Sequence, residues 1–156
     1  MICEMNGASM KPLIKLMKRH SGIASLMKHS EGASGYDICL DTNCVETFLF
    51  PGQTKGFPTG IFLEMPEGIE AQIRPRSGLA FRSQVTVLNS PGTIDSDYRG
   101  EIYVILINHG PVMVTIKPGE RIAQLVFCPV FTVDFEETKE LSTTKRGQNG
   151  LGSTGK

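Results

Sequence analysis

The 156-residue sequence has no excess charge of either sign, because 16 acidic side chains balance 16 basic ones. Broad electrostatic attachment to nucleic acid or to an anionic membrane is therefore not expected. The chain also lacks an apolar run long enough to span a bilayer, and its first residues lack the apolar block of a secretory signal. We expect one cytoplasmic domain with no nucleic-acid or membrane partner.

Paired cysteines are also missing. None of the four cysteines follows another at C-x-x-C spacing, and the three histidines are scattered along the chain. A metal site or a disulfide frame is therefore a minor alternative, and reduced structural thiols are expected. Zinc chemistry and a cysteine–histidine nucleophile are set aside on the same grounds. The four cysteines are Cys3, Cys39, Cys44 and Cys128.

Patterns typical of long helices are scarce, and only Leu79–Gln84 and, marginally, Glu136–Lys145 could form helices. Short segments rich in β-branched and aromatic residues dominate instead, separated by many of the 17 glycines and 9 prolines. This pattern predicts an all-β barrel or sandwich. Ile102–Ile107 is apolar at successive positions, so we expect both its faces to be covered, in a central strand or at a subunit contact. The predicted strands are Leu13–Met17, Tyr36–Leu40, Val45–Phe50, Ile61–Met65, Ala71–Arg74, Val85–Leu88, Ile102–Ile107, Val112–Ile116, Ile122–Phe127 and Val130–Phe135.

The two ends of the chain differ from its middle. Residues 1–11 are expected to be loosely ordered. After Phe135 the apolar periodicity stops and Gly, Ser and Thr become frequent. We therefore divide the chain into a β domain over residues 1–135 and a mobile C-terminal arm over residues 136–156.

The densest polar chemistry lies in Asn89–Ile102, a broad predicted turn between two strands. Turns at the edge of a rigid sheet often carry binding groups. The same residue types are also ordinary turn formers, so this segment alone leaves both interpretations open. Its polar side chains include those of Asn89, Asp95, Asp97, Tyr98 and Arg99.

The arm reads G-L-G-S-T-G over residues 150–155, which matches the G-x-G-x-x-G of dinucleotide-binding loops and, with Lys156, most of a Walker loop. Both motifs need a following helix to hold phosphate, and the sequence ends at Lys156, so we expect neither. The glycines still allow backbone N–H groups to converge on an anion, with Arg146, Ser153 and Thr154 as further donors. A phosphate-gripping arm and a plain disordered tail remain the two alternatives.

Three further clusters are polar in the same way. P-R-S-G-L-A at residues 75–80 places a guanidinium, a hydroxyl and a glycine just after a strand, which suits phosphate oxygens. S-G-Y-D at residues 34–37 puts a carboxylate at the start of a strand. P-G-E-R-I-A-Q-L at residues 118–125 carries Gln124 among apolar neighbours, either as a hydrogen-bonded core amide or as a site group. The sequence alone favours the core amide.

Together, the clusters A-S-G-Y-D, P-R-S-G-L-A, N-S-P-G-T-I-D-S-D-Y-R-G-E, P-G-E-R-I-A-Q-L and R-G-Q-N-G-L-G-S-T-G closely resemble the five motifs of the trimeric dUTP diphosphatase (dUTPase) family, in the same order. The resemblance covers roughly residues 12–155. It implies a distorted jelly-roll β-barrel and a homotrimer with three active sites at subunit boundaries. It also implies Mg²⁺-dependent hydrolysis of dUTP to dUMP and pyrophosphate, which lowers dUTP and supplies dUMP for thymidylate synthesis.

The resemblance assigns the reacting groups. Asp95 would orient the attacking water, accept its proton and touch the sugar 3′-hydroxyl, and Gln124 would help to hold that water. Asp37 would reach the water shell of a Mg²⁺ ion that the phosphates chelate. The bridge between the α- and β-phosphates would be met by Arg76, Ser77 and the Gly78 backbone.

The resemblance also assigns selectivity. The Tyr98 ring would pack under the deoxyribose and leave no room for a 2′-hydroxyl. The uracil edge would be recognised by Asn89 and by backbone groups near Thr93, Ile94 and Tyr103. The arm would close over the phosphates through Arg146, Leu151, Gly152, Ser153 and Thr154. Leu151 departs from the family, which has an aromatic residue there, and so forgoes a stacking contribution of about 1 kcal/mol.

Two other functions were weighed. A related module that binds nucleotide or protein without turnover would be expected to lack Asp95, Ser77 or Arg146, and all three are present. A dCTP deaminase would need a glutamate base near the pyrimidine and a different second motif. Hydrolysis of dUTP therefore remains the preferred interpretation.

Overall fold

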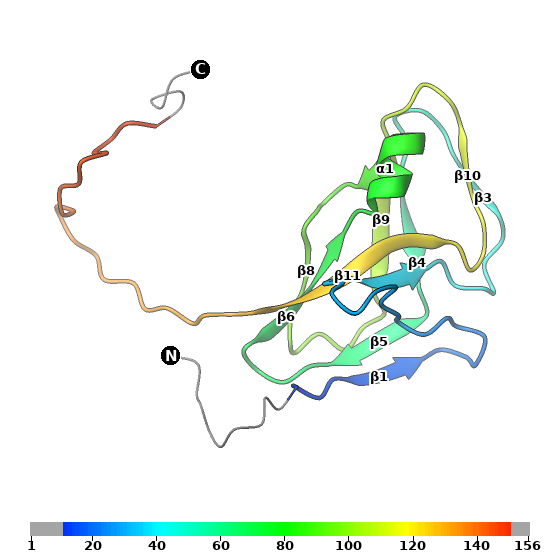
Figure 1. Cartoon of the computed structure of the whole chain (residues 1–156), viewed down its shortest axis with the longest axis horizontal. Helices are drawn as coiled ribbons and strands as arrows, with labels where there is room; N and C mark the ends of the chain where they lie inside the picture. Colours follow the sequence, from blue (N-terminus) through cyan, green and yellow to red (C-terminus); the bar gives the residue numbers. More distant parts are fainter. Residues whose placement is uncertain (1–10, 151–156) are drawn as a thin grey trace.

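The computed structural model describes residues 11–150 of the chain, which fold into short β-strands and one short helix (Figure 1). The strands form open, antiparallel sheets, so an all-β, jelly-roll-like fold is confirmed, although no sheet of the described part closes into a barrel. The elements are β1 (Lys15–Lys18), β2 (Tyr36–Cys39), β3 (Thr47–Leu49), β4 (Thr54–Pro58), β5 (Ile61–Glu64), β6 (Ile69–Arg74), α1 (Ser77–Ser83), β7 (Val85–Val87), β8 (Gly92–Ile94), β9 (Tyr103–Asn108), β10 (Val114–Ile116) and β11 (Arg121–Pro129).

The largest sheet has the order β2-β11-β6-β8 and carries four of the predicted site residues, Asp37, Thr93, Ile94 and Gln124. Its central strand, β11, alternates between fully buried side chains such as Leu125 and partly exposed ones such as Gln124. Opposite Gln124 lie Asp37 of β2 and Arg74 of β6. The apolar face of the strand therefore fixes the core while its other face presents polar groups from three strands at one edge.

A second sheet, β4-β9-β7, has β9 at its centre. Val104 and Leu106 of β9 are fully buried, whereas Ile105 and Ile107 are only partly so. The prediction of a central strand over Ile102–Ile107 is confirmed, but one face is covered less completely than the other. Two smaller sheets pair β1 with β5 and β3 with β10.

Several element predictions need correction. Glu136–Lys145 contains no helix, and α1 begins at Ser77 rather than Leu79. Val130–Phe135 is not a strand, because no neighbouring strand in the described chain pairs with it. The remaining predicted strands are present with shifted ends.

Two strands were missed by the sequence prediction. In β4, Gly56 and Pro58 hide the strand pattern, and Lys55 and Gly56 are exposed, as expected at a sheet edge. In β8, Gly92–Ile94 lies inside the predicted broad turn and pairs with β6. The turn is therefore anchored by a short strand before its polar residues begin.

Residues 130–150 carry no helix or strand and extend away from the sheets (Figure 1). Their large apolar side chains, including Phe131, Val133 and Phe135, are exposed. The division into a domain over residues 1–135 and a mobile arm over residues 136–156 remains a prediction. No helix in residues 11–150 is long and apolar enough to cross a membrane.

Candidate functional site

A small cavity lies at the end of β8, where the predicted polar turn begins. Its volume is about 200 Å³. Tyr98 closes the turn over itself, because its N–H donates to the Asp95 carbonyl at 3.1 Å and its hydroxyl donates to the Glu101 carbonyl at 2.9 Å. The structure thus brings five predicted site residues together, along with Glu101, which was not predicted. The lining residues are Thr93, Ile94, Asp95, Tyr98, Glu101 and Tyr103.

Asn89 lies outside the lining of this cavity. Its side chain is exposed and packs against Gly92 at the start of β8, where a Cβ atom on Gly92 would lie 2.9 Å from Asn89 Nδ2. The amide therefore sits beside the strand that leads into the cavity. Its contact with a base remains a prediction.

A second polar group surrounds Asp37, whose side chain is 15% exposed. Arg76 Nε donates to Asp37 Oδ1 at 3.1 Å, and Arg121 Nη1 donates to Oδ2 at 3.0 Å. His29 Nε2 also lies 3.0 Å from Oδ2. We call Asp37, His29, Arg76 and Arg121 the Asp37 cluster; it holds more cationic side chains than carboxylates.

Gln124 completes this polar edge, and its Nε2 donates to the Pro75 carbonyl at 2.9 Å. Gly35 leaves the space for the Gln124 side chain, since a Cβ atom at Gly35 would lie 2.1 Å from Gln124 Oε1. Any larger residue at position 35 would displace the amide. The glycine of the S-G-Y-D motif is therefore explained by the close approach of the Gln124 side chain to its backbone. Gln124 itself is a hydrogen-bonded amide at the edge of the candidate site.

Arg76 precedes α1 in an extended conformation and also donates through Nη1 to the Arg121 carbonyl at 3.0 Å. Ser77, the first residue of the helix, is exposed, and Gly78 is partly exposed. The guanidinium is therefore fixed between β2 and β11, while the neighbouring hydroxyl faces solvent. Three of the predicted motifs meet here.

The cavity and the Asp37 cluster do not meet within one protomer. Ile94, which precedes Asp95, faces Ala71 near one end of β6, whereas Gln124 faces Arg74 at the other end. Three residues of strand separate these positions, which is about 10 Å along β6. Asp95 lies one residue farther still, so a single chain does not place its carboxylate beside Gln124.

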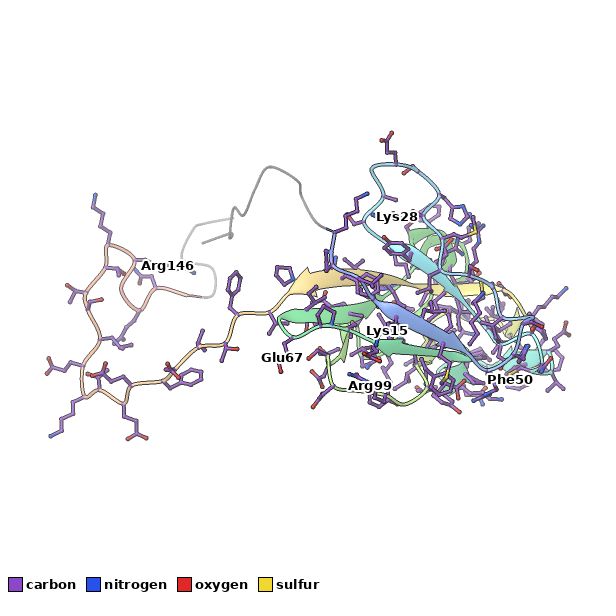
Figure 2. All side chains as sticks on the ribbon, turned by 90° about the horizontal axis from the view of Figure 1, so that it is seen from below. Lys15, Lys28, Phe50, Glu67, Arg99 and Arg146 are labelled. Atoms are coloured by element: carbon purple, nitrogen blue, oxygen red, sulfur yellow. The ribbon has the colours of Figure 1, made fainter. Side chains whose placement is uncertain are left out.

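Arg146 lies on the extended segment, away from the sheets (Figure 2), and its Nε donates to the Asn149 carbonyl at 2.9 Å. The structure does not bring it to the other predicted site residues. The predictions for Leu151, Gly152, Ser153 and Thr154 fall outside the described residues.

The described residues 11–150 contain no group of three or more His, Cys, Asp or Glu side chains placed to hold a metal ion. Cys39, Cys44 and Cys128 are free thiols, and Cys3 is outside the described range. Burial, together with the nearby Asp37 carboxylate, raises the pKa of the Cys39 thiol. It is therefore protonated at neutral pH and unsuited to nucleophilic attack.

Sequence reasoning missed Arg19, His29, Glu101 and Arg121 as members of these polar groups. Arg121 stands in the P-G-E-R-I-A-Q-L motif, and its alternation with apolar neighbours on β11 was a usable signal. Glu101 follows the Y-R-G segment directly. Arg19 lies 82 positions before Glu101, so no local pattern marks it. His29 lies only eight positions before Asp37, but it stands outside the S-G-Y-D motif.

Known proteins resemble this chain along most of its length. A statistical model of the family described as dUTPase matches residues 22–155. A deoxyuridine 5′-triphosphate nucleotidohydrolase of Hydrogenobaculum sp. is 52% identical over 147 residues, covering 94% of this chain and 99% of its own. The enzyme of that name from Beijerinckia indica is 50% identical over 144 residues, covering 92% of this chain and 90% of its own.

Two solved structures share the fold. The dUTPase of Staphylococcus bacteriophage 80alpha, a G164S mutant with dUpNHpp, aligns with a TM-score of 0.83 at 22% identity, covering 92% of this chain and 98% of its own. A dUTPase from S. aureus phage phi11, described with a structural Mg(II) ion, aligns with a TM-score of 0.75 at 18% identity, covering 84% and 99%. With the family match over most of the chain and relatives about half identical along nearly its whole length, the chain belongs to the dUTPase family.

Proposed function

We propose that the chain hydrolyses dUTP to dUMP and pyrophosphate by in-line attack of water on the α-phosphate. The observation that carries this proposal is the 52% identity, over 94% of the chain, to a curated dUTP nucleotidohydrolase. Such hydrolysis needs an aligned water, donors at the phosphates and a pocket for the nucleoside. The activity would act on the cytoplasmic nucleotide pool, lowering dUTP and supplying dUMP for thymidylate synthesis.

The cavity at the end of β8 is the proposed nucleoside pocket. Asp95 is exposed at its lining, where a carboxylate can orient a water and accept its proton. The Tyr98 ring would lie against the deoxyribose and exclude a 2′-hydroxyl. Asn89 and the backbone of Thr93, Ile94 and Tyr103 would hydrogen-bond the uracil edge. A site built around such bonds rejects bases that leave its polar groups unpaired.

The Asp37 cluster is the proposed phosphate end of the site. Its surplus of cationic side chains suits a triphosphate, and Arg76 would meet the α/β bridge together with Ser77 and the Gly78 backbone. Gln124 would hold the attacking water that Asp95 aligns. The carboxylate oxygens of Asp37 are hard ligands, and cationic donors occupy both, which fits contact with a Mg²⁺ ion through water. When bound, the ion would neutralise phosphate charge.

Self-association would unite the two ends of the site, because Asp95 and Gln124 lie at opposite ends of β6 in one protomer. We propose a homotrimer in which residues 130–135 of one protomer pack on another. In this segment alternate apolar side chains, those of Phe131, Val133 and Phe135, are exposed as on an unpaired strand. Carboxylates at positions 134, 136 and 137 accompany them.

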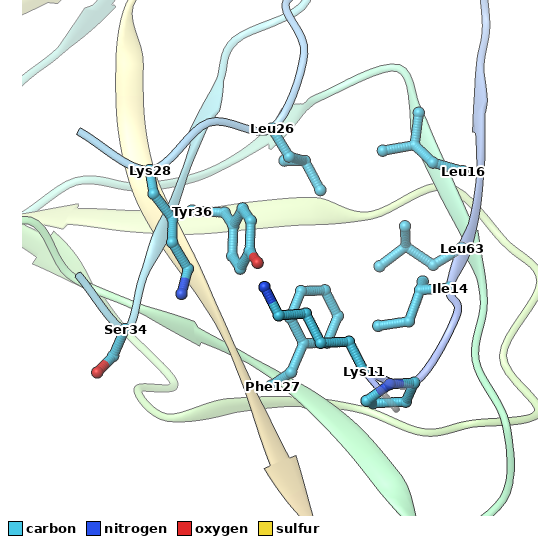
Figure 3. Close-up of a pocket in the computed structure, with 10 residues that line it drawn as sticks. Lys11, Ile14, Leu16, Leu26, Lys28, Ser34, Tyr36, Leu63 and Phe127 are labelled. Carbon is cyan, nitrogen blue, oxygen red and sulfur yellow. The ribbon is translucent and has the colours of Figure 1, made fainter. Parts of the chain in front are cut away.

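A pocket beside β1 offers a matching surface (Figure 3). Its volume is about 390 Å³, and Lys11 and Lys28 reach over an otherwise apolar lining. Tyr36 and Phe127 meet edge to face at 5.7 Å at its base, and Lys28 Nζ lies 5.0 Å from the Tyr36 ring. Apolar side chains with nearby carboxylates complement such a pocket in both area and charge. Its aliphatic lining comprises Ile14, Leu16, Leu26 and Leu63.

The arm over residues 136–156 would then reach the phosphates of an assembled site. Arg146 would donate to the phosphates, with Ser153, Thr154 and the Gly152 backbone, while Leu151 would cover the base. In the described part of the arm, side chains are exposed and free to make such contacts. The domain over residues 1–135 would carry the remaining site residues.

Deamination is disfavoured by the state of Glu101, the one glutamate that lines the cavity. Its Oε1 accepts the Gly60 N–H at 2.8 Å, and its Oε2 is paired with Arg19. Both oxygens of this carboxylate are therefore already occupied by donors of the protein. Hydrolysis is thus better supported than attack on the base.

Pyrophosphate release from dUTP, dTTP, dCTP and UTP, with Mg²⁺ present or chelated, tests the function. The native chain should strongly prefer dUTP and lose activity on chelation. Asp95→Asn should lose about 10³-fold in kcat, whereas Asp97→Asn, an exposed neighbouring carboxylate, should not. A chain ending at Lys145 should lose activity yet remain trimeric by light scattering. Indifference among the four nucleotides, or equal loss in both aspartate variants, would refute the assignment.

A further inference from the structure

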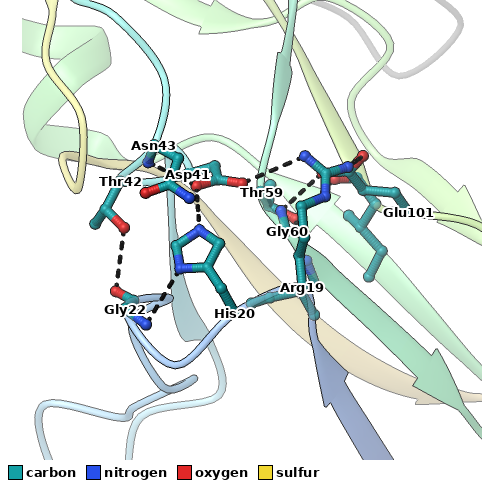
Figure 4. Close-up of polar contacts among 11 residues, drawn as sticks. Arg19, His20, Gly22, Asp41, Thr42, Asn43, Thr59, Gly60 and Glu101 are labelled. Atoms are coloured by element: carbon teal, nitrogen blue, oxygen red, sulfur yellow. Dashed lines mark hydrogen bonds and ion pairs between the residues drawn. The ribbon is translucent and has the colours of Figure 1, made fainter.

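A network of charged side chains shares Glu101 with the lining of the proposed nucleoside cavity (Figure 4). It joins Glu101 to Arg19, Gly60, Asp41 and His20, and we call these residues the Glu101 network. Glu101 belongs to both structures. Its carbonyl accepts the Tyr98 hydroxyl on the cavity side at 2.9 Å, while its carboxylate, 8% exposed, points into the network.

Two donors hold the Glu101 carboxylate from different elements. Gly60 N–H donates to Oε1 at 2.8 Å, and Arg19 Nη2 donates to Oε2. Arg19 is itself tied to the same peptide, because its backbone N–H donates to the Gly60 carbonyl at 2.8 Å. The end of β1, the start of β5 and the turn of the cavity are thus joined through one carboxylate.

Glycine is the only residue type that this junction accommodates at position 60. Its φ is +68°, and a Cβ atom there would lie 2.5 Å from Ile23 Cδ1 and 3.1 Å from Asp41 Oδ2. A side chain would therefore be strained and would collide with the core. Close approach of the backbone is what lets its N–H reach Glu101.

Asp41 fixes the direction of Arg19 from the other side. The Asp41 side chain is 1% exposed, and its Oδ2 lies 3.4 Å from Arg19 Nη1. His20 Nε2 and the Asn43 N–H each lie 2.8 Å from Asp41 Oδ1. The guanidinium is therefore held between two carboxylates with little freedom to turn away from Glu101.

The charge of Arg19 is also stabilised by the groups around it. Partial desolvation lowers the pKa of Arg19, but the Glu101 charge, the hydrogen bonds to Glu101 and Tyr103, and the Asp41 charge raise it above its usual value. The guanidinium remains charged at any pH at which the protein folds. Tyr103, like Tyr98, lines the cavity.

We propose that Arg19 and Glu101 are positioning residues for the nucleoside pocket. Their ion pair fixes the Glu101 carbonyl that holds Tyr98, and so sets how tightly the pocket closes on the sugar. This inference rests on the proposed hydrolysis of dUTP. It assigns a role in sugar selectivity to Arg19, which lies 82 positions before its partner Glu101.

Breaking the pair should loosen the pocket more than it slows the chemistry. Glu101→Gln and Arg19→Met should each raise KM for dUTP about tenfold and raise the relative use of UTP about tenfold. Their kcat for dUTP should fall less than KM rises. Arg19→Lys keeps the charge and should restore most of the selectivity.

Lys15→Met is the matched control. Lys15 Nζ pairs with Glu64 Oε1 at 2.7 Å on the same two strands, but both side chains are exposed and neither lines the cavity. It should leave KM and the UTP preference unchanged. An equal change in Lys15→Met would show that any lost ion pair has this effect and would overturn the inference.

The measurements are steady-state kinetics on dUTP and UTP, with binding of a non-hydrolysable dUTP analogue by calorimetry. If Arg19→Met does not fold, Glu101→Gln, which keeps shape and hydrogen-bonding capacity, decides the question. Folded Glu101→Gln with native KM, analogue affinity and UTP preference would overturn the inference while leaving dUTP hydrolysis intact. A native chain inactive on dUTP would instead refute the proposed function, and this inference with it.

Discussion

Asp37 and Asp41 lie four residues apart, and each pairs with at least one arginine and one histidine, yet the two clusters differ in access to solvent. The Asp37 side chain is 15% exposed, whereas that of Asp41 is 1% exposed. At Asp37 the cations outnumber the carboxylates. At Asp41 a second carboxylate, Glu101, joins the group, so the carboxylates outnumber the arginines.

The comparison shows how one set of residue types serves two purposes. An open cluster with surplus positive charge can exchange its partners for phosphate oxygens. A cluster whose carboxylates are sealed from solvent and that has no surplus of positive charge, here called the sealed cluster, instead holds the surrounding chain in place. Burial and charge balance, rather than residue identity, separate the proposed site from its support.

The largest expected effect is on stability. Asp41→Asn should lower the free energy of unfolding by about 2 kcal/mol, because His20 loses a charged hydrogen-bond partner and Arg19 keeps only Glu101. The kcat on dUTP should stay near the native value at temperatures where the variant is folded. Urea unfolding at a fixed protein concentration measures the change. A loss below about 1 kcal/mol would mean that the sealed cluster is not structural.

At the open Asp37 cluster we expect the opposite: a large effect on activity and a small one on stability. Asp37→Asn should reduce kcat/KM for dUTP by about ten- to a hundredfold, as is typical for a group that acts on a metal through its water shell. Its free energy of unfolding should change by less than about 1 kcal/mol, because the partners are partly solvated. Kinetics over a range of Mg²⁺ concentrations provide the measurement. Unchanged activity would remove Asp37 from the proposed site.

The sequence could predict the parts of the molecule that local patterns encode. The β-branched segments located β2, β5, β9 and β11 within a few residues. Val130–Phe135 has the composition of a strand but finds no partner in its own chain, and pairing cannot be read from composition. β4 was hidden by Gly56 and Pro58, which are tolerated at an edge.

The candidate site likewise has a part that the sequence predicts and a part that it does not. Thr93, Ile94, Asp95 and Tyr98 lie close in sequence, so their motif predicted the cavity that they line. The residues that support the cavity depend on tertiary contacts instead. Arg19 and Glu101 are 82 positions apart in the sequence, and no local pattern near either residue predicts that they pair.

Acidic pH should act on the sealed cluster. Burial alone raises the pKa of Asp41, but the Asn43 N–H, the hydrogen bond and charge of His20, and the charge of Arg19 lower it below its usual value. Since the folded pKa lies below the unfolded one of about 3.9, this stabilisation is present above pH 4 and is lost as the pH falls through the folded pKa.

Urea midpoints between pH 6 and pH 2 test this dependence. Native stability should fall more steeply below pH 4 than that of Asp41→Asn, so the gap between the two proteins should narrow in acid. Asp37→Asn serves as the control and should follow the native curve more closely. Parallel curves for the native chain and Asp41→Asn would show that folding does not change the pKa of Asp41.

The smallest effects on stability should come from replacing the two histidines. These substitutions compare the Asp37 and Asp41 clusters most directly. His20→Asn should cost about 1 kcal/mol of unfolding free energy, because His20 Nε2 is one of the two donors 2.8 Å from a buried carboxylate oxygen, the other being the Asn43 N–H. His29→Asn should cost less than about 0.5 kcal/mol, because His29 is 56% exposed and Arg121 also serves the same oxygen. Both values come from urea unfolding at pH 7. Equal costs would mean that solvent access does not distinguish the clusters, since the two substitutions are chemically identical and differ only in their surroundings.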